Sequence, residues 1–197
     1  TGYPSHAGIA PEKGVSAAAI AAMAVADLHR DGWHGLIEKD GATGTSNVGV
    51  IDAGVATNVV AERARLHIEA RSHDPAFRQR IIDRIEQAFR DAVQEVISKE
   101  GRRGEVRFDG RLNYESFRLA EDDPSLAAAR EALVAVGVEP EITVANGGLD
   151  ANWITAHGVP TVSLGTGQRN IHTVDEELDL EQFHLSRRIA WRLATIA

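Results

Sequence analysis

The chain contains no cysteine among its 197 residues. This absence excludes a disulfide framework, a thiolate metal site and a cysteine nucleophile. Any metal that this chain binds must therefore be held by His, Asp or Glu side chains. Those ligands suit zinc, manganese or cobalt.

Clusters of basic residues are also missing. The 21 Lys and Arg residues are outnumbered by 29 Asp and Glu residues, and the formal net charge is −8. Nucleic acids and anionic membranes attract clustered Lys and Arg, so we expect neither as the main partner. The longest apolar stretch, residues 15–28, is alanine-rich and too short to span a membrane. No signal peptide is recognisable, and we expect a cytoplasmic protein.

The first residues lack an initiator Met, a polar tail and a helix cap. The segment Thr1-Gly2-Tyr3-Pro4-Ser5-His6 is instead typical of the interior of a domain. We therefore expect a fragment, a processed chain or a chain that lacks upstream sequence. A hydrophobic content of 43% is enough for one large or two small globular domains.

Residues 1–112 show the order of elements of a ferredoxin-like domain. Hydrophobic residues recur at helical spacing in two segments and alternate along others. The order strand, helix, strand, strand, helix, strand predicts a four-stranded antiparallel sheet with both helices on one face. The expected elements are a short strand before Pro11, a helix over 16–30 that begins at Ser16, a loop over 41–46, strands over 47–54 and 63–72, a helix over 75–99 and a strand over 104–112.

Residues 113–197 show a different pattern, in which strands alternate with helices. This alternation predicts part of a parallel α/β sheet. Two strands are too few for an independently stable sheet with both faces covered, so we expect this segment to complete a domain whose first half lies upstream of Thr1. The expected elements are helices over 124–136, 147–156 and 180–196 and strands over 141–144 and 160–164.

Two loops in this second segment contain candidate site residues. His172 follows a predicted strand and lies close to Asp175 and Glu176, at the strand end where α/β proteins bind ligands. A lone loop histidine is more often solvated or braces its loop. Gly147 and Gly148 lie between a strand and a helix, where their N–H groups can face an anion. A tight turn with Asp150 near the helix start explains the same residues equally well.

Three further candidates lie in the first segment. His6 is on or just after the first strand, and by itself it is more readily explained as a surface or packed histidine. Asn58 is at a polar loop tip, where its amide either binds a substrate or closes the turn. Arg71 alternates with the apolar side of its strand and is expected on the sheet surface opposite the helices. There it either clamps a carboxylate or pairs with Glu69 or Asp74.

Together, five motifs closely resemble the peptidase T-like members of the aminoacylase and carboxypeptidase superfamily of dinuclear zinc metallopeptidases. Their order and spacing cover nearly the whole chain, which makes the resemblance specific, whereas each motif alone is weak. The motifs are Ser5-His6-Ala7-Gly8-Ile9-Ala10-Pro11-Glu12-Lys13-Gly14, Gly54-Val55-Ala56-Thr57-Asn58-Val59-Val60, Glu69-Ala70-Arg71-Ser72-His73-Asp74, Gly147-Gly148-Leu149-Asp150-Ala151-Asn152 and the segment from Gly165-Thr166-Gly167 to His172-Thr173.

The resemblance implies an organisation and a set of roles. Residues 1–112 correspond to the family's lid, which also mediates dimerisation, and residues 113–197 to the second half of its catalytic domain. His172 corresponds to the C-terminal metal ligand and His6 to the lid histidine that reaches the active site of the other protomer. Asn58 and Arg71 correspond to lid groups that bind substrate. Gly147, Gly148 and Asp150 fall in the substrate-side loop.

The implied reaction is hydrolysis of an amide bond in a short peptide or an N-acyl amino acid. Two zinc ions, or cobalt or manganese, activate a water, a glutamate removes its proton, and His6 stabilises the oxyanion. The family's other metal ligands and its general base do not occur in this chain. We therefore expect an incomplete metal site, an inactive isolated chain and a homodimeric assembly.

Three functions remain open at this stage. Part of a tripeptidase is the first choice, because the segments around His6 and Asp150 resemble peptidase T-like proteins most closely. An aminoacylase or carboxypeptidase activity is the second. A non-catalytic dimerisation or binding module is the third, and such a protein is expected to end near residue 112, which this chain does not.

Overall fold

The computed structural model describes residues 1–195, which form two compact units. The first unit covers residues 1–111 and the second begins at Leu112. No helix within the described range is both long enough and apolar enough to cross a lipid bilayer.

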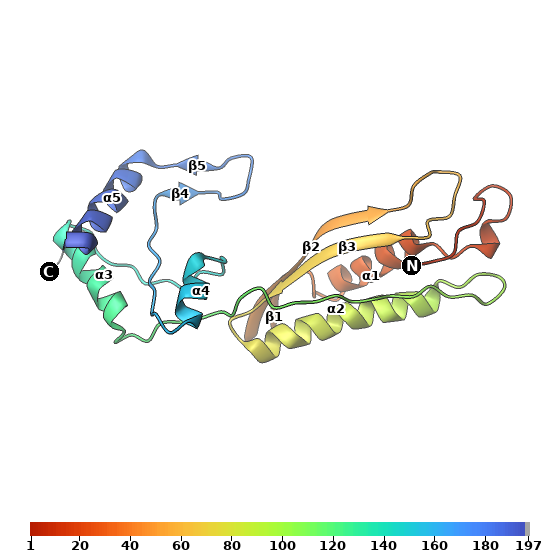
Figure 1. The fold of residues 1–197 in the computed structure, drawn as a ribbon, viewed down its shortest axis with the longest axis horizontal. Coiled ribbons are helices and arrows are strands. Elements are labelled where there is room, and N and C mark those ends of the chain that lie inside the picture. The colour runs from red at the N-terminus through yellow and green to blue at the C-terminus, as the bar shows by residue number, and fades with distance from the viewer. Residues whose placement is uncertain (196–197) are drawn as a thin grey trace. The chain divides into compact units, whose positions relative to one another are not determined.

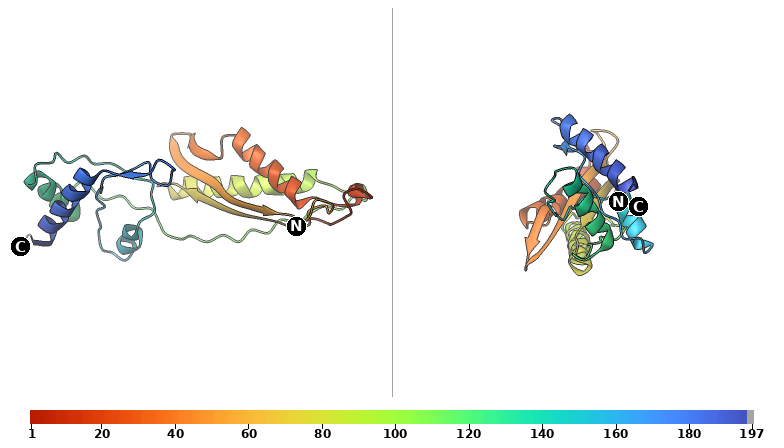
Figure 2. Two further views of the ribbon diagram at one scale, coloured as in Figure 1. Left: turned by 90° about the horizontal axis from the view of Figure 1, so that it is seen from above. Right: turned by 90° about the vertical axis from the view of Figure 1, so that its left-hand side faces the viewer.

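The first unit is an antiparallel sheet with two helices on one face (Figures 1 and 2). The strand order is β1-β2-β3, and the helices α1 and α2 pack against each other and against the sheet. The mixed α/β class predicted from the sequence is confirmed. The elements are η1 (Pro11–Lys13), α1 (Ala17–Arg30), β1 (Gly35–Lys39), β2 (Ala42–Ala53), β3 (Ala64–Arg71) and α2 (Pro75–Glu95).

Both helices begin at the capping residues that their sequences contain. The Ser16 hydroxyl accepts a hydrogen bond from the N–H of Ala19, and the Asp74 carboxylate accepts from Ala76 and Phe77. The apolar faces of the helices close the core against β3. The largest fully buried side chains are Phe77, Leu28, Ile37, Ile81 and Val15.

The β1–β2 hairpin corrects the expected loop over 41–46. Strand β2 already begins at Ala42, and Asp40 and Gly41 form the turn with φ angles of 53° and 77°, the backbone that a two-residue hairpin requires. Gly44 of β2 has a packing role. A Cβ added to Gly44 would lie 2.7 Å from Cδ1 of Ile81, so the glycine permits α2 to approach the strand.

The first residues of this unit and the segment around Glu105 extend the sheet through individual backbone hydrogen bonds and do not form regular strands. Gly2 donates to the carbonyl of Glu62, and Thr1 and Glu105 exchange two backbone bonds of 2.6 and 2.9 Å. Across the sheet, the segments therefore lie in the order segment around Glu105, N-terminal segment, β3, β2. This order agrees with the predicted ferredoxin-like arrangement. The strand expected over 104–112 is reduced to this contact, and β1 is an additional strand at the opposite edge.

The second unit contains three helices and one two-stranded hairpin. The predicted helices are present, and the expected end at residue 196 lies outside the described range. The strands predicted over 141–144 and 160–164 do not occur, because no neighbouring strand among the described residues of this unit supplies hydrogen-bond partners. The elements are α3 (Pro124–Ala135), α4 (Asp150–Ala156), β4 (Gln168–Arg169), β5 (Glu177–Leu178) and α5 (Leu180–Thr195).

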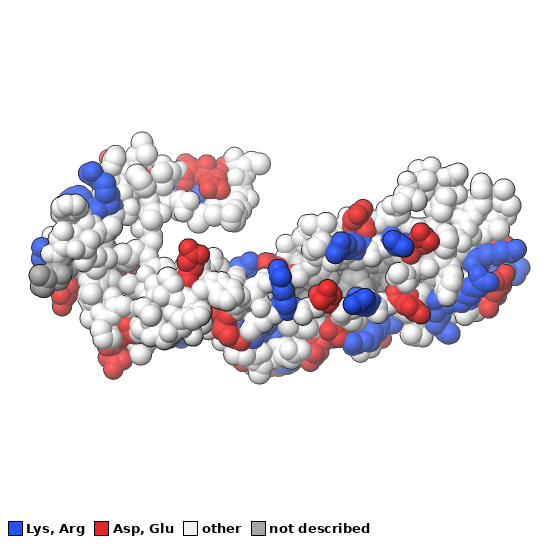
Figure 3. Space-filling model, viewed as in Figure 1, with Lys and Arg blue, Asp and Glu red and all other residues white. Residues whose placement is uncertain are grey.

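The charged residues of the first unit are mixed in sign over its surface. Figure 3 shows acidic and basic side chains side by side on the face in view. Several form exposed ion pairs, such as Arg80 with Asp40 and Arg84 with Asp31, at 2.9 and 2.6 Å. Exposed pairs contribute little to stability. This face has no single-sign field of the kind that would attract a polyanion.

Candidate functional site

His6 lies in a tight turn at the tip of the first unit, with its side chain exposed. The backbone N–H groups of Gly8 and Ile9 both donate to its Nδ1 atom, at 3.1 and 3.2 Å. The backbone carbonyl of His6 accepts from Ile9 and Ala10. Ring and backbone are therefore fixed by the same short turn.

Asn58 is the predicted site residue that the fold brings next to His6. Its carbonyl accepts a 2.9 Å hydrogen bond from the N–H of Ala7, and His6 forms an antiparallel bridge with Val59. Asn58 is exposed within the β2–β3 loop. Figure 1 shows this loop and the turn at residues 5–14 at the same end of the first unit. Two predicted residues that are distant in sequence thus occupy one surface.

Arg71 lies at the other end of β3. Its Nη2 atom is 2.7 Å from the Glu69 carboxylate, and both side chains are partly exposed. The pairing follows from strand geometry, because residues two apart share one face of a sheet. Arg71 is seven positions after Ala64 along β3, which corresponds to about 23 Å at about 3.3 Å per residue. Asn58 precedes Ala64, so Arg71 is distant from the pair formed by Asn58 and His6.

Gly147 and Gly148 form the loop that leads into α4, and Asp150 is the first residue of that helix. Gly148 lies against Tyr114, whose hydroxyl would be 1.9 Å from an added Cβ. The loop is anchored by Asn152, which is 7% exposed. Its Oδ1 accepts from the N–H of Leu149, and its Nδ2 donates to the carbonyl of Glu115.

The sequence interpretation assigned no role to Tyr114 or Asn152. A polar side chain at the third position of a helix reaches back to the N–H of the residue before the helix in a capping box, which usually has Glu or Gln there, so the position of Asn152 is a weak local signal for a loop anchor. No local signal identifies Tyr114, because its contact depends on tertiary structure.

His172 is at the tip of the β4–β5 hairpin, exposed and with a φ of 66°. This left-handed backbone is uncommon for a residue with a side chain. The N–H of His172 donates to the Glu176 carboxylate at 2.9 Å, which closes the tip. The Arg169 guanidinium lies 2.8 Å from Asp179 and 3.7 Å from Glu177 at the base of the hairpin.

The donor set around His172 does not fit a complete metal site. A protein metal site of this chemistry uses three or more His, Asp or Glu ligands. No group of three such residues within residues 1–195 is arranged so that it could hold a metal ion. Within the described chain, His172 is a single potential ligand whose neighbouring carboxylate, that of Glu176, already binds the backbone.

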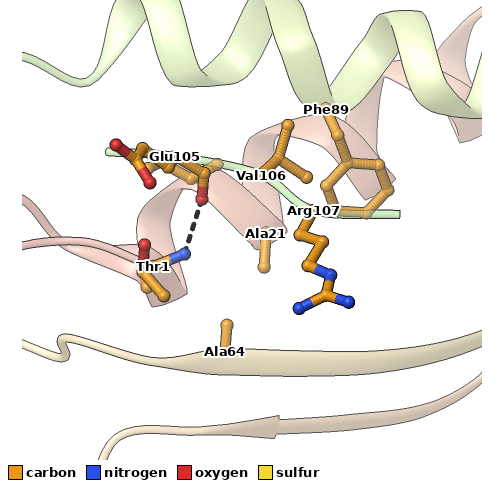
Figure 4. A pocket seen from close by; sticks show the side chains of 9 residues that line it. Thr1, Ala21, Ala64, Phe89, Glu105, Val106 and Arg107 are labelled. Atoms are coloured by element: carbon orange, nitrogen blue, oxygen red, sulfur yellow. Dashed lines mark hydrogen bonds between the residues drawn. The ribbon is translucent and has the colours of Figure 1, made fainter. Parts of the chain in front are cut away.

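A small pocket lies within the first unit. Figure 4 shows Thr1 and Glu105 at one side of it, joined by their hydrogen bond, with Ala64 of β3 and Phe89 of α2 around it. Its lining combines apolar side chains with Thr1, Glu105 and Arg107 and includes none of the predicted site residues. The full lining is Thr1, Ala17, Ile20, Ala21, Ala64, Phe89, Glu105, Val106 and Arg107.

Comparison with known families identifies the first unit. The family model described as "Peptidase dimerisation domain" matches residues 1–96. Among curated proteins, the uncharacterized protein YqjE of Bacillus subtilis is 33% identical over 181 residues, which is 92% of this chain and 45% of that protein. One subunit of the p-aminobenzoyl-glutamate hydrolase of Escherichia coli is 39% identical over 93 residues, which is 47% of this chain and 20% of that protein.

Two solved structures are similar over 98% of this chain. One is the aminopeptidase PepT from Bacillus cereus, with 32% identity and a TM-score of 0.71. The other is a tripeptidase from Staphylococcus aureus, with 29% identity and a TM-score of 0.77. The chain spans 48% of each of these proteins. It therefore covers less than half the length of the relatives that it matches.

Proposed function

Because the chain is a peptidase T-like relative within the aminoacylase and carboxypeptidase superfamily, we propose that it is part of a metal-dependent exopeptidase that hydrolyses short peptides. The observation that carries the proposal is the similarity to a tripeptidase structure over 98% of the chain at a TM-score of 0.77. Residues 1–112 serve as the lid and dimerisation domain, and residues 113–197 contribute to the catalytic domain.

The separation of the lid residues supports an assembly with two active sites. An extended tripeptide spans only about 10 Å at about 3.3 to 3.6 Å per residue. Arg71 is more than twice that distance from the end of β3 that leads to Asn58 and His6. One short substrate therefore cannot contact both ends of β3 in the same subunit.

In the proposed homodimer, the two ends of the lid act in different active sites. Arg71 binds the terminal carboxylate of a peptide as a guanidinium clamp, and this requires that it exchange its partner Glu69 for the substrate. His6 and Asn58 act in the site of the other protomer, where His6 donates a hydrogen bond to the developing oxyanion and Asn58 binds the substrate. Gly147, Gly148 and Asp150 line the substrate side of the catalytic domain.

The proposed metal site is the part of this function that the described residues do not complete. We propose His172 as one ligand of a zinc site, with cobalt or manganese as alternatives. Accordingly, the 197-residue chain by itself is expected to hydrolyse no peptide. Clear turnover by the purified chain, free of any longer enzyme, would contradict this expectation.

An aminoacylase-type or carboxypeptidase-type activity is the second candidate. It is favoured by the relative named as a p-aminobenzoyl-glutamate hydrolase, whose 39% identity over 93 residues exceeds that of the tripeptidase structure. That name describes hydrolysis of an amide with a glutamate on one side. Such a substrate has a carboxylate that Arg71 can bind as well as it binds a peptide terminus. The third candidate, a non-catalytic dimerisation module, requires only the first unit.

A substrate panel separates these functions. The natural gene product that contains this sequence is assayed with tripeptides, dipeptides and N-acyl amino acids, with and without added zinc. Tripeptide cleavage that a chelator abolishes is the expected result. Preference for N-acyl amino acids would replace the first candidate by the second, and no hydrolysis of any amide would favour the non-catalytic module.

Light scattering of the 197-residue chain tests the assembly. We expect a mass of twice the 21.2 kDa monomer. A strictly monomeric mass at high protein concentration would contradict the proposed action of His6 across the dimer interface.

A further inference from the structure

The turn at residues 6–9 constrains which nitrogen of the His6 ring carries a proton. The N–H groups of Gly8 and Ile9 both point at Nδ1, at 3.1 and 3.2 Å. A backbone N–H only donates, so Nδ1 must present its lone pair to them. In a neutral imidazole the proton is then on Nε2.

We propose that this turn is a positioning device that holds His6 as an Nε2–H donor. The backbone of the turn is itself fixed, because the His6 carbonyl accepts from Ile9 and Ala10 and the Ala7 N–H donates to Asn58. The ring lies over Gly8, where an added Cβ would be 3.7 Å from Cε1 of His6. Side chain and main chain are thus held in one orientation before any ligand arrives.

This inference rests on the role proposed for His6 and makes it more specific. An oxyanion requires a hydrogen-bond donor, and the other neutral tautomer would present a lone pair on Nε2 that repels it. Gly8 and Ile9 are positioning residues, since they act through the ring and their N–H groups are used by it. The direction of the Nε2–H bond is set by the turn and costs no reorganisation during the reaction.

Nitrogen NMR of the 197-residue chain tests the tautomer directly. The chain is labelled uniformly with ¹⁵N and studied in mildly alkaline buffer, and the signals of His6 are assigned by their loss in His6→Ala. We expect a protonated Nε2, an unprotonated Nδ1 and a coupling through the hydrogen bond between Nδ1 and the Gly8 amide nitrogen. A proton on Nδ1, or comparable amounts of both tautomers, would overturn the proposal.

A pair of variants tests the turn itself. The side chain of His6→Asn still has an oxygen that can accept from the two amides, as in an Asx-turn, whereas that of His6→Ala has no acceptor. We expect hydrogen exchange at the Gly8 amide to be about fivefold faster in His6→Ala, the effect of losing one ordinary hydrogen bond, and near the original rate in His6→Asn. The Ile9 amide also donates to the His6 carbonyl in both variants, so its exchange should change less. Equal acceleration in both variants would contradict the acceptor role of Nδ1.

Gly8→Ala is the matched control. Its added Cβ meets only ordinary contacts and its N–H is retained, so the tautomer of His6 is expected to stay the same. A changed tautomer in this variant would show that the ring is positioned by something other than the two amides. None of these measurements depends on hydrolysis, so failure of the proposed peptidase function would leave their outcome unaffected.

Discussion

The two units of this chain differ in how they bury their apolar residues. The core of the first unit contains large side chains from both helices and from β1, including Leu28, Ile37 and Phe77. The buried apolar residues described in the second unit are three alanines and Ile189. Its larger apolar side chains remain exposed, for example Trp191 at 73%.

This difference indicates where the stability of the chain resides. Burial of large apolar side chains is the main favourable term in folding, and segments with few buried contacts open at low free-energy cost. The first unit therefore resembles an independent domain, whereas the second depends on further surfaces to cover its apolar groups. Truncation of a large apolar side chain should therefore lower the free energy of unfolding more in the first unit than in the second.

The largest expected effect is from Phe77→Ala in the first unit. Phe77 is 2% exposed, and truncation of a buried Phe costs about 3 to 5 kcal/mol. Urea unfolding is followed by the fluorescence of Trp33, the tryptophan of this unit, in a background with Trp153→Phe and Trp191→Phe. The comparison in the second unit has Trp191→Ala in place of Trp191→Phe in the same background, and we expect it to change stability by less than about 0.5 kcal/mol. Similar losses in both variants would remove the distinction between the units.

Gly44→Ala is expected to have the next largest effect. The added methyl group would approach Ile81 Cδ1 to 2.7 Å and the Arg71 carbonyl oxygen to 2.6 Å. Overpacking of this kind costs about 1 to 3 kcal/mol. Gly49→Ala in the same strand is the control, because its nearest neighbour is an Asn47 side-chain atom at 3.6 Å. Equal midpoints for both variants in urea would show that α2 does not pack closely on β2.

The same glycine explains a limit of the sequence interpretation. The Gly/Thr-rich segment 41–46 suggests a loop when each residue is considered by its propensity, yet it lies in β2 because Gly44 and Ser46 face the helices. The Asp40-Gly41 pair is a hairpin signal that local reasoning could have used. By contrast, helical periodicity, with the cap at Ser16, was sufficient to predict α1 and α2. The helix predicted over 75–99 was too long, because α2 ends at Glu95.

The candidate site was less accessible from sequence. The contact between Ala7 and Asn58 depends on pairing between segments that are distant in the chain, which no local pattern encodes. The ion pair of Arg71 with Glu69 was predictable, since residues two apart in a strand share a face. Extended segments such as 141–144 could be predicted as apolar, but whether they form strands depends on partners outside their own sequence.

A smaller effect is expected at the helix caps, where the two units contain the same local motif. Asp74-Pro75 begins α2 and Asp123-Pro124 begins α3, and each carboxylate accepts from the backbone N–H two residues later. Asp74→Ala should lower the stability of the first unit by about 1 kcal/mol, measured by the Trp33 transition. Asp123→Ala should leave that transition unchanged. A shift of the Trp33 midpoint in Asp123→Ala would show that the units unfold together.

The smallest effect is a pH dependence confined to α3. The Ser125 hydroxyl donates to the Asp123 carboxylate at 2.6 Å and lowers the pKa of this group below its ordinary value, with further help from the backbone N–H groups of Ser125 and Leu126. A lowered pKa in the folded state stabilises the helix start above the ordinary carboxyl pKa. This contribution is lost as the pH falls through the lower value.

The protection of the α3 amides, which is the factor by which their exchange is slower than the intrinsic rate at the same pH, should therefore decrease in acid. The decrease should be larger in the parent chain than in Asp123→Asn, because the Asn side chain keeps a capping oxygen but does not titrate. Ser125→Ala removes the hydroxyl and should return the pKa of Asp123 towards its ordinary value, which carboxyl NMR measures. An unchanged pKa in Ser125→Ala would show that this hydroxyl is not the cause. The amides of α2 are the internal reference. Their exchange depends on the stability of the first unit and should not change in Asp123→Asn or Ser125→Ala.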